Sequence, residues 1–248
     1  MRLSGKNFAV EINVPTQDAL MVEVAARFAA QDGFALATIN LDHVTKLESD
    51  VGFRTAYNAQ DLVVADGNPI VWVSRLAGKS VELMPGSELV VPLTQLAAEK
   101  GVSIALIGSS DASLAAAADA LKAAAQGLEI SYVHAPEYGF DPQGDAVRAV
   151  LKDVAASGAQ LAFLALGAPK QELFAALGRE LAPNVGFASI GAGLDFLSGE
   201  QVRAPLWVRK IAMEWAWRLL SNPRRFFMRY LSCALVLPGL GWRAFKSR

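Results

Sequence analysis

Short apolar stretches alternate with longer amphipathic stretches along most of the chain, and this alternation restricts the fold more than any other feature. The strand-like stretches are 7–14, 34–39, 62–66, 102–107, 128–134, 160–166 and 185–190. The stretches between them have helical periodicity, such as the one that Thr16 can cap and that extends to about Ala30. The pattern predicts βαβ units, and therefore a Rossmann-like α/β fold with a mostly parallel sheet and helices on both faces.

Polar or glycine-rich residues follow several of these strands at their C-terminal ends. In a parallel sheet such ends lie along one edge, and ligands bind in the crevice beyond them. The segments that should meet there are Thr38 to Asn40, Asp66, Gly108-Ser109, 167–171 and 191–193. We therefore expect a ligand site at this edge of the sheet.

Asp66 ends the apolar run 62–65 and is followed at once by Gly67. A buried strand that ends in an acid can hold a catalytic or ligand-binding carboxylate rigidly. The alternative is an Asp-Gly turn with a solvated carboxylate. Thr38 and Asn40 present a similar choice, because they can cap the next helix or orient a sugar hydroxyl.

Two strand-to-helix junctions could bind an anion. Gly108 opens a Gly-Ser-Ser-Asp turn that could offer backbone N–H groups to a phosphate, or could form only a helix cap at Asp111. Lys170 and Gln171 lie in the first turn of a helix, where a lysine opposes the helix dipole unless it meets an anion; a solvated first turn is the alternative. Neither the dinucleotide nor the P-loop glycine pattern is present.

Composition excludes several classes of site. The single cysteine, Cys233, excludes a disulfide framework, and the two histidines, His43 and His134, are too far apart to form a ligand-spaced pair. We interpret His43 as a surface residue or a residue behind the site, and His134 as structural. No Asp-x-Asp motif occurs, so a metal–diphosphate clamp is unsupported and no cofactor is expected. No apolar leader is present at the N-terminus, so we expect no signal peptide.

The C-terminal segment, residues 203–248, differs sharply from the rest of the chain. It carries ten of the 23 Lys and Arg residues but one of the 24 Asp and Glu residues, which gives about +9 against about −10 for residues 1–202. Four of the five tryptophans also lie in it. We therefore divide the chain into an acidic α/β domain, 1–202, and a basic, aromatic helical appendage, 203–248.

Basic residues interleaved with aromatic ones are typical of proteins that bind nucleic acid or an anionic membrane surface. The apolar run 231–240 is too short to span a bilayer, which needs about 20 residues. The third interpretation is a helix packed on the body through its tryptophans. We favour an appendage that associates with an anionic membrane surface, and expect no nucleic-acid partner.

The motifs together resemble the WecG/TagA/CpsF family of bacterial glycosyltransferases. The similar stretches are 38–40, 65–72 (Ala-Asp-Gly-Asn-Pro-Ile-Val-Trp), 85–89, 166–172 (Leu-Gly-Ala-Pro-Lys-Gln-Glu), 191–196, 203–207, 214–218, 222–225 and 229–230. The resemblance implies an inverting, metal-independent transfer of a sugar from a UDP-sugar to a polyprenyl-diphosphate-linked saccharide. Such an enzyme would contribute to an exopolysaccharide, capsule or cell-wall polymer.

The same resemblance assigns roles to individual residues. It implies that Asp66 is the general base, and that Thr38, Asn40 and Gln171 line the substrate pocket. Arg218 and Arg225 are the best matches for the arginines that the appendage contributes to the site, where they could stabilise the departing UDP in place of a metal. One departure concerns residues 81–85, which lack an arginine that the family usually has, so the donor sugar is left open.

These expectations place the protein in the cytoplasm, peripheral on the inner face of the cell membrane, as a possible homo-oligomer. Two other functions remain open. The chain could be a non-catalytic nucleotide-sugar-binding or scaffolding subunit of a polysaccharide assembly complex, in which case Asp66 would be dispensable. It could also bind RNA or DNA through its basic appendage.

Overall fold

The computed structural model describes residues 1–137 and 139–248, apart from the side chain of Arg225. Within that part, six strands form one sheet in the order β4-β3-β8-β7-β5-β6, and every neighbouring pair is parallel. The strands are β3 (Phe34–Ile39), β4 (Leu62–Ala65), β5 (Ile104–Gly108), β6 (Ile130–His134), β7 (Leu161–Ala165) and β8 (Gly186–Ser189). The predicted Rossmann-like parallel sheet is confirmed.

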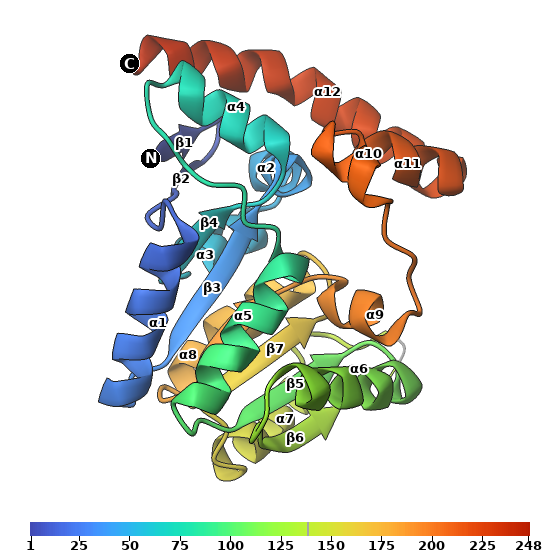
Figure 1. Cartoon of the computed structure of the whole chain (residues 1–248). Coiled ribbons are helices and arrows are strands. Elements are labelled where there is room, and N and C mark those ends of the chain that lie inside the picture. The colour runs from blue at the N-terminus through green and yellow to red at the C-terminus, as the bar shows by residue number, and fades with distance from the viewer. Residues whose placement is uncertain (138) are drawn as a thin grey trace.

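Helices cover both faces of this sheet, which explains why its central strands are apolar at nearly every position (Figure 1). One face packs against α1 (Gln17–Ala30), α5 (Gly86–Glu99) and α6 (Asp111–Ala124). The other packs against α7 (Asp145–Ala156) and α8 (Lys170–Leu181), and α3 (Val51–Asn58) lies beside α8. Strand β6, at the edge, is partly exposed along its whole length.

The predicted first strand, 7–14, is only partly correct. Its central residues form β2 (Ala9–Glu11), which pairs antiparallel with β1 (Arg2–Ser4) in a separate small sheet. The residues after β2 instead protect the edge of β4. The Asn13 side chain accepts a 2.8 Å hydrogen bond from the Val63 N–H and donates a 2.7 Å bond to the Asp61 carbonyl.

The polar stretch after Asn40 forms a helix, α2 (Leu41–Ser49), that the sequence pattern did not predict. Asn40 caps it by accepting a hydrogen bond from the backbone N–H of His43. Val44 and Leu47 bury its inner face. One cap also differs from expectation: Ser110 rather than Asp111 caps α6.

The C-terminal segment forms three helices, α10 (Leu206–Lys210), α11 (Glu214–Ser221) and α12 (Pro223–Lys246), which follow α9 (Gly193–Ser198). In Figure 1, α12 runs along α4 (Asn68–Leu76) beyond the end of β3. Near its C-terminal end, Leu240 and Ala244 are buried against the body of the protein. No helix in the described part of the chain has the length and apolarity needed to cross a membrane.

Ion pairs join these helices to the body at two places. The Glu88 carboxylate on α5 lies 2.7 Å from the Arg203 guanidinium and 3.1 Å from that of Arg209. Asp42 on α2 lies 3.0 Å from the Nε of Arg229 and also pairs with Lys46. The appendage is therefore docked against the α/β body through α2, α4 and α5.

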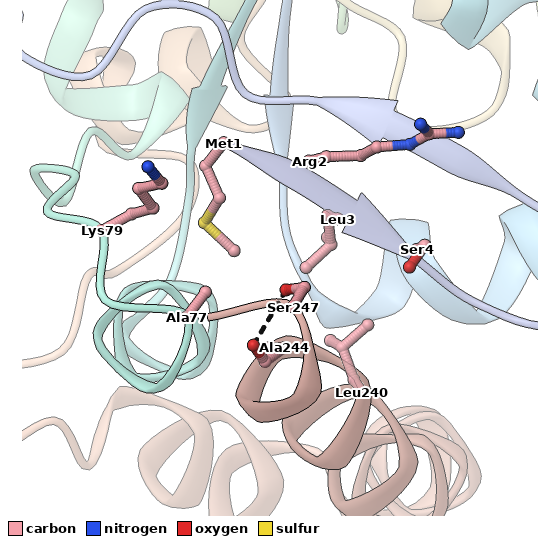
Figure 2. Close-up of a pocket in the computed structure, with 9 residues that line it drawn as sticks. All are labelled: Met1, Arg2, Leu3, Ser4, Ala77, Lys79, Leu240, Ala244 and Ser247. Carbon is pink, nitrogen blue, oxygen red and sulfur yellow. Dashed lines mark hydrogen bonds between the residues drawn. The ribbon is translucent and has the colours of Figure 1, made fainter.

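A hollow of about 190 Å³ marks one end of this docking surface (Figure 2). Met1 and Leu3 of the N-terminal pair, Ala77 and Lys79 after α4, and the last turns of α12 line it. The Ser247 hydroxyl at its edge donates to the Ala244 carbonyl. The hollow lies at the C-terminal end of α4, whereas Asp66 precedes the N-terminal end of that helix. We interpret it as a packing seam, separate from the candidate site.

Candidate active site

The order of the strands brings four predicted features together at one edge of the sheet. Asp66 follows β4, Thr38 and Asn40 lie at the end of β3, Gly191 follows β8, and Gln171 follows β7. Those four strands are consecutive neighbours in the sheet. The N-terminus of α5 also reaches this edge, because a Cβ on Gly86 would lie 3.2 Å from the Thr38 hydroxyl.

The turn after β4 fixes the position of the Asp66 side chain. The Asp66 N–H donates to the Ile39 carbonyl at 2.8 Å, which continues the pairing of β4 with β3 by one residue. Gly67 then adopts φ +98°, a conformation that residues with a side chain rarely adopt, and α4 starts at the next residue. The turn is therefore tight, and it leaves the carboxyl group at the end of the strand.

Asn40 contacts both Asp66 and α2. Its Nδ2 donates to Asp66 Oδ2 at 3.3 Å, while its Oδ1 accepts from the His43 N–H at 3.0 Å. The two roles that the sequence suggested for Asn40, as a helix cap and as a group in the site, are compatible. The cap fixes the amide so that its donor faces the carboxylate.

Burial raises the pKa of Asp66 to about 6. The hydrogen bond from Asn40 and the positive charges of Arg218 and Arg229 lower this pKa, while the negative charge of Glu214 raises it. A carboxylate with such a pKa is largely ionised at neutral pH, yet it is more basic than an ordinary aspartate. Both properties suit a group that accepts a proton.

Two arginines from the appendage supply positive charge near Asp66. Arg218 on α11 pairs with Glu214 at 2.6 Å, and its guanidinium lies 5.6 Å from the centre of the Phe196 ring. Arg229 on α12 pairs with Asp42. The side chain of Arg225, the other predicted arginine, lies outside the described part of the chain. Arg229 was not among the predicted site residues.

The two predicted residues at the start of α8 have different partners. Gln171 is only 2% exposed; its Oε1 accepts from the Gly191 N–H at 3.1 Å and its Nε2 donates to Glu172 at 2.9 Å. It therefore ties the turn after β7 to the turn after β8. The Lys170 ammonium donates instead to the Phe140 carbonyl at 2.7 Å, so it anchors the loop before α7.

The turn at Gly108 has acidic surroundings. A Cβ at Gly108 would lie 2.5 Å from the Ala165 carbonyl, so glycine is needed for β5 to approach β7. The hydroxyl of the next residue, Ser109, donates to the Asp195 carboxylate, and Ser110 donates to Glu200 at 3.3 Å. The carboxylates of Asp195 and Glu200 would repel a phosphate group at this turn. Phosphate binding at Gly108 remains a prediction.

A buried polar group lies behind the site. It includes His43, which is 4% exposed, so of its two interpretations the one as a residue behind the site agrees with the structure and the one as a surface residue does not. It also includes Glu172, which is fully buried and was not predicted. In the sequence, only position indicates these residues. Glu172 adjoins Gln171 at the start of a helix, and His43 lies three residues after Asn40. The described side chains include no group of three His, Cys, Asp or Glu residues that could hold a metal ion.

The fold and the site define a class: an α/β protein whose ligand site lies beyond the ends of parallel strands. At that edge of the sheet, burial raises the pKa of the Asp66 carboxyl group, and the positive charges of Arg218 and Arg229 act on that group.

The family model described as "Glycosyl transferase WecG/TagA/CpsF family" matches residues 6–248, and the chain belongs to this family. The family resemblance that the motifs indicated is therefore confirmed, and so is the class of protein, a glycosyl transferase. One curated relative is an N-acetylglucosaminyldiphosphoundecaprenol N-acetyl-beta-D-mannosaminyltransferase from Bacillus spizizenii (strain ATCC 23059 / NRRL B-14472 / W23). It is 30% identical over 175 residues, which cover 70% of this chain and 66% of the relative.

Proposed function

We propose that the protein transfers a sugar from a UDP-sugar to a saccharide linked to polyprenyl diphosphate, with inversion at the anomeric carbon and without a metal ion. The observation that carries this proposal is Asp66, a carboxyl group with a raised pKa, held by Asn40 at the end of β4 and approached by Arg218 and Arg229. Family membership and the name of the Bacillus relative support the substrate classes.

The residues fit a single displacement. Asp66 takes the proton of the acceptor hydroxyl as its oxygen forms a bond to the anomeric carbon and the bond to UDP breaks. The leaving group carries the electron pair away as a diphosphate, and guanidinium groups stabilise that growing negative charge. One displacement inverts the configuration, so an α-linked nucleotide sugar gives a β linkage. The β product in the relative's name agrees with this course.

The acceptor class agrees with the surface of the appendage. Its helices expose large apolar side chains, including Trp207 at 65%, Leu220 at 81% and Phe227 at 57% exposure. A lipid-linked acceptor presents its diphosphate at a membrane surface, and Arg218 lies on α11 with Leu220, and Arg229 on α12 with Phe227. We therefore propose a peripheral position on the inner face of the cell membrane.

The test is a transfer assay with a panel of UDP-sugars and a short polyprenyl-diphosphate-linked N-acetylglucosamine acceptor, with products identified by mass spectrometry. We expect one UDP-sugar to extend the acceptor by one residue, equally well in the presence of chelator. Asp66→Asn should lower turnover by at least about 10³-fold while donor binding persists, because the amide cannot take the proton.

Three outcomes would contradict the proposal. Loss of all transfer with chelator would remove the metal-free mechanism. Wild-type turnover by Asp66→Asn would remove Asp66 as the base. A non-catalytic nucleotide-sugar-binding subunit would bind donor and give no product with any member of the panel.

A further inference from the structure

Behind the candidate site lies a buried cluster of polar side chains, made of His43, Tyr57, Gln60, Gln171 and Glu172. None of them is more than 8% exposed. A buried carboxyl group is costly unless it is hydrogen-bonded, and Glu172 Oε2 has no partner among the described residues. A cluster of this kind needs an explanation beyond packing.

One half of the cluster holds the turn after β8. Glu172 Oε1 accepts the hydrogen bond from Gln171 Nε2 at 2.9 Å, which orients the Gln171 amide. The amide oxygen, thus fixed, accepts from the Gly191 N–H at 3.1 Å. Glu172 therefore decides which way the Gln171 amide faces, and through it the position of the Gly191 turn.

The other half leads to Asp66. The His43 ring lies with Nε2 3.9 Å from Glu172 Oε1, and its Nδ1 lies 3.3 Å from the Tyr57 hydroxyl. The backbone N–H of His43 donates to Asn40, whose amide donates to Asp66. The first turn of α2 thus connects Glu172 on one side with the Asp66 carboxylate on the other.

The protonation states agree with this arrangement. Burial lowers the pKa of His43 to about 3 and raises that of Glu172 to about 7, which favours an uncharged pair. The charged groups that affect both residues are Lys46 and Asp42 on α2, and Arg229 of α12 also lowers the pKa of His43. A neutral carboxyl group offers a fixed acceptor without a buried charge.

We propose that Glu172 and His43 are positioning residues for the transfer reaction. The Glu172 carboxyl group, backed by the His43 ring, orients Gln171 so that the Gly191 turn and Asp66 are held at a fixed separation across the strand ends. This inference rests on the proposed function for its kinetic consequence. Both side chains are too deeply buried to touch a substrate, so they act through Gln171, Gly191 and Asn40.

The test compares Glu172→Gln with Glu172→Leu. Glutamine keeps an uncharged acceptor for Gln171, so we expect kcat within about twofold of wild type. Leucine fills the space without an acceptor and leaves the Gln171 amide free to rotate, so we expect kcat to fall at least about tenfold. A smaller loss, about threefold, is expected for His43→Phe, which keeps the ring packing against Phe53 and Tyr57 but removes the polar nitrogens.

A second measurement is independent of catalysis. Amide hydrogen exchange at Gly191 should be at least about tenfold faster in Glu172→Leu than in wild type, and unchanged in Glu172→Gln. Thr94→Val is the matched control, because Thr94 is a fully buried polar residue on α5, outside the cluster. It should leave both kcat and Gly191 exchange as in wild type.

The outcomes separate this inference from the proposed function. If the wild type transfers no sugar but Gly191 exchange responds as expected, the proposed function fails and the positioning contact stands. Unchanged Gly191 exchange in Glu172→Leu overturns the inference. A kcat loss in Glu172→Gln as large as that in Glu172→Leu also overturns it, because the carboxylate charge would then be required.

Discussion

A single carboxyl group, Asp66, shows how burial, a neighbouring amide and two guanidinium groups of the appendage together set a proton affinity. Burial alone would favour the neutral acid, which could not accept a proton. The hydrogen bond from Asn40 and the charges of Arg218 and Arg229 stabilise the ionised form and so lower the pKa again in part. The result is a pKa near 6, between that of a solvated aspartate and that of a fully buried one.

This balance predicts the pH dependence of the rate. Since the base must be ionised, kcat/KM should fall about tenfold per pH unit below pH 6. Arg218→Ala removes a positive charge that favours the carboxylate, so this acidic limb should move to higher pH by about half a unit or more. Rate profiles from pH 5 to 8 measure the shift. Arg243→Ala, on the exposed last part of α12, is the control and should leave the acidic limb at the same pH as in wild type. An acidic limb that shifts to lower pH in Arg218→Ala would contradict the argument.

Glu172 predicts a pH dependence of stability. Its pKa is raised from 4.5 to about 7, so the folded protein binds this proton more tightly than the unfolded chain between those pH values. The contribution of Glu172 to the free energy of unfolding should therefore decrease as pH rises through that window, by about 3 kcal/mol. Urea unfolding at pH 5 and pH 8 should show a change between the two pH values that is more destabilising in wild type than in Glu172→Gln by about this amount. Asp66 acts in the same direction and His43 in the opposite one, but both are present in both proteins, so the difference isolates Glu172.

At the scale of elements, the turn between β4 and α4 determines where the base lies. Gly67 has φ +98° and ψ 138°, a region that is essentially reserved for glycine. The strand, the turn and the helix start could each be predicted from the sequence, because an apolar run, a glycine and a proline have strong local preferences.

Gly67→Ala should therefore destabilise the protein by about 1 to 3 kcal/mol and displace Asp66, with a loss of turnover. Gly52→Ala is the contrasting control, because Gly52 lies in the first turn of α3 with a negative φ and space for a methyl group. It should leave stability equal or slightly higher. Chemical unfolding of the two variants tests the contrast, and an equal effect in both would argue against backbone strain at Gly67.

What the sequence could not predict at this scale has a physical explanation. Helix α2 is short, and only three of its nine residues are apolar, so the pattern was interpreted as a polar stretch; the Asn40 cap and burial of Val44 and Leu47 stabilise the helix. The polar cluster at Glu172 depends on contacts between residues far apart in the chain. The approach of Arg229 to Asp42 depends on how α12 docks. Strand ends were predictable, whereas of the groups behind them only His43 was anticipated.

At the scale of the whole molecule, the acidic body and the basic helices are not independent. Helices α10 to α12 contact α2, α4 and α5 through ion pairs and a small apolar seam, and they still expose many large apolar side chains. Such a surface is typical of a partner-binding or membrane-binding face. The charge asymmetry predicted that these residues differ from the rest, and the family resemblance implied Arg218 as a site residue; only the structure shows that Arg229 also acts on Asp66.

Replacing Trp207, Leu220 and Phe227 together by serine should weaken binding to anionic vesicles. At about 1 kcal/mol for each side chain, the loss is about 100-fold. Transfer to a short, soluble acceptor should stay within about twofold. Vesicle co-sedimentation measures the binding. The matched control places serine at Val22, Val51 and Leu181, which are exposed apolar residues of the body; an equal loss in that control would contradict a specific membrane face.

The first turn of α2 has a consequence for how this sequence can vary. Within one turn, Asn40 contacts Asp66, Asp42 pairs with α12, and His43 lies against Glu172. The three residues lie in one turn and one network of contacts, so the effects of their substitutions on the free energy of unfolding and on the rate should not be additive. A change that is neutral in one background will be harmful in another. Exchange of this turn between related proteins should succeed only when its residues and their partners are moved as a block.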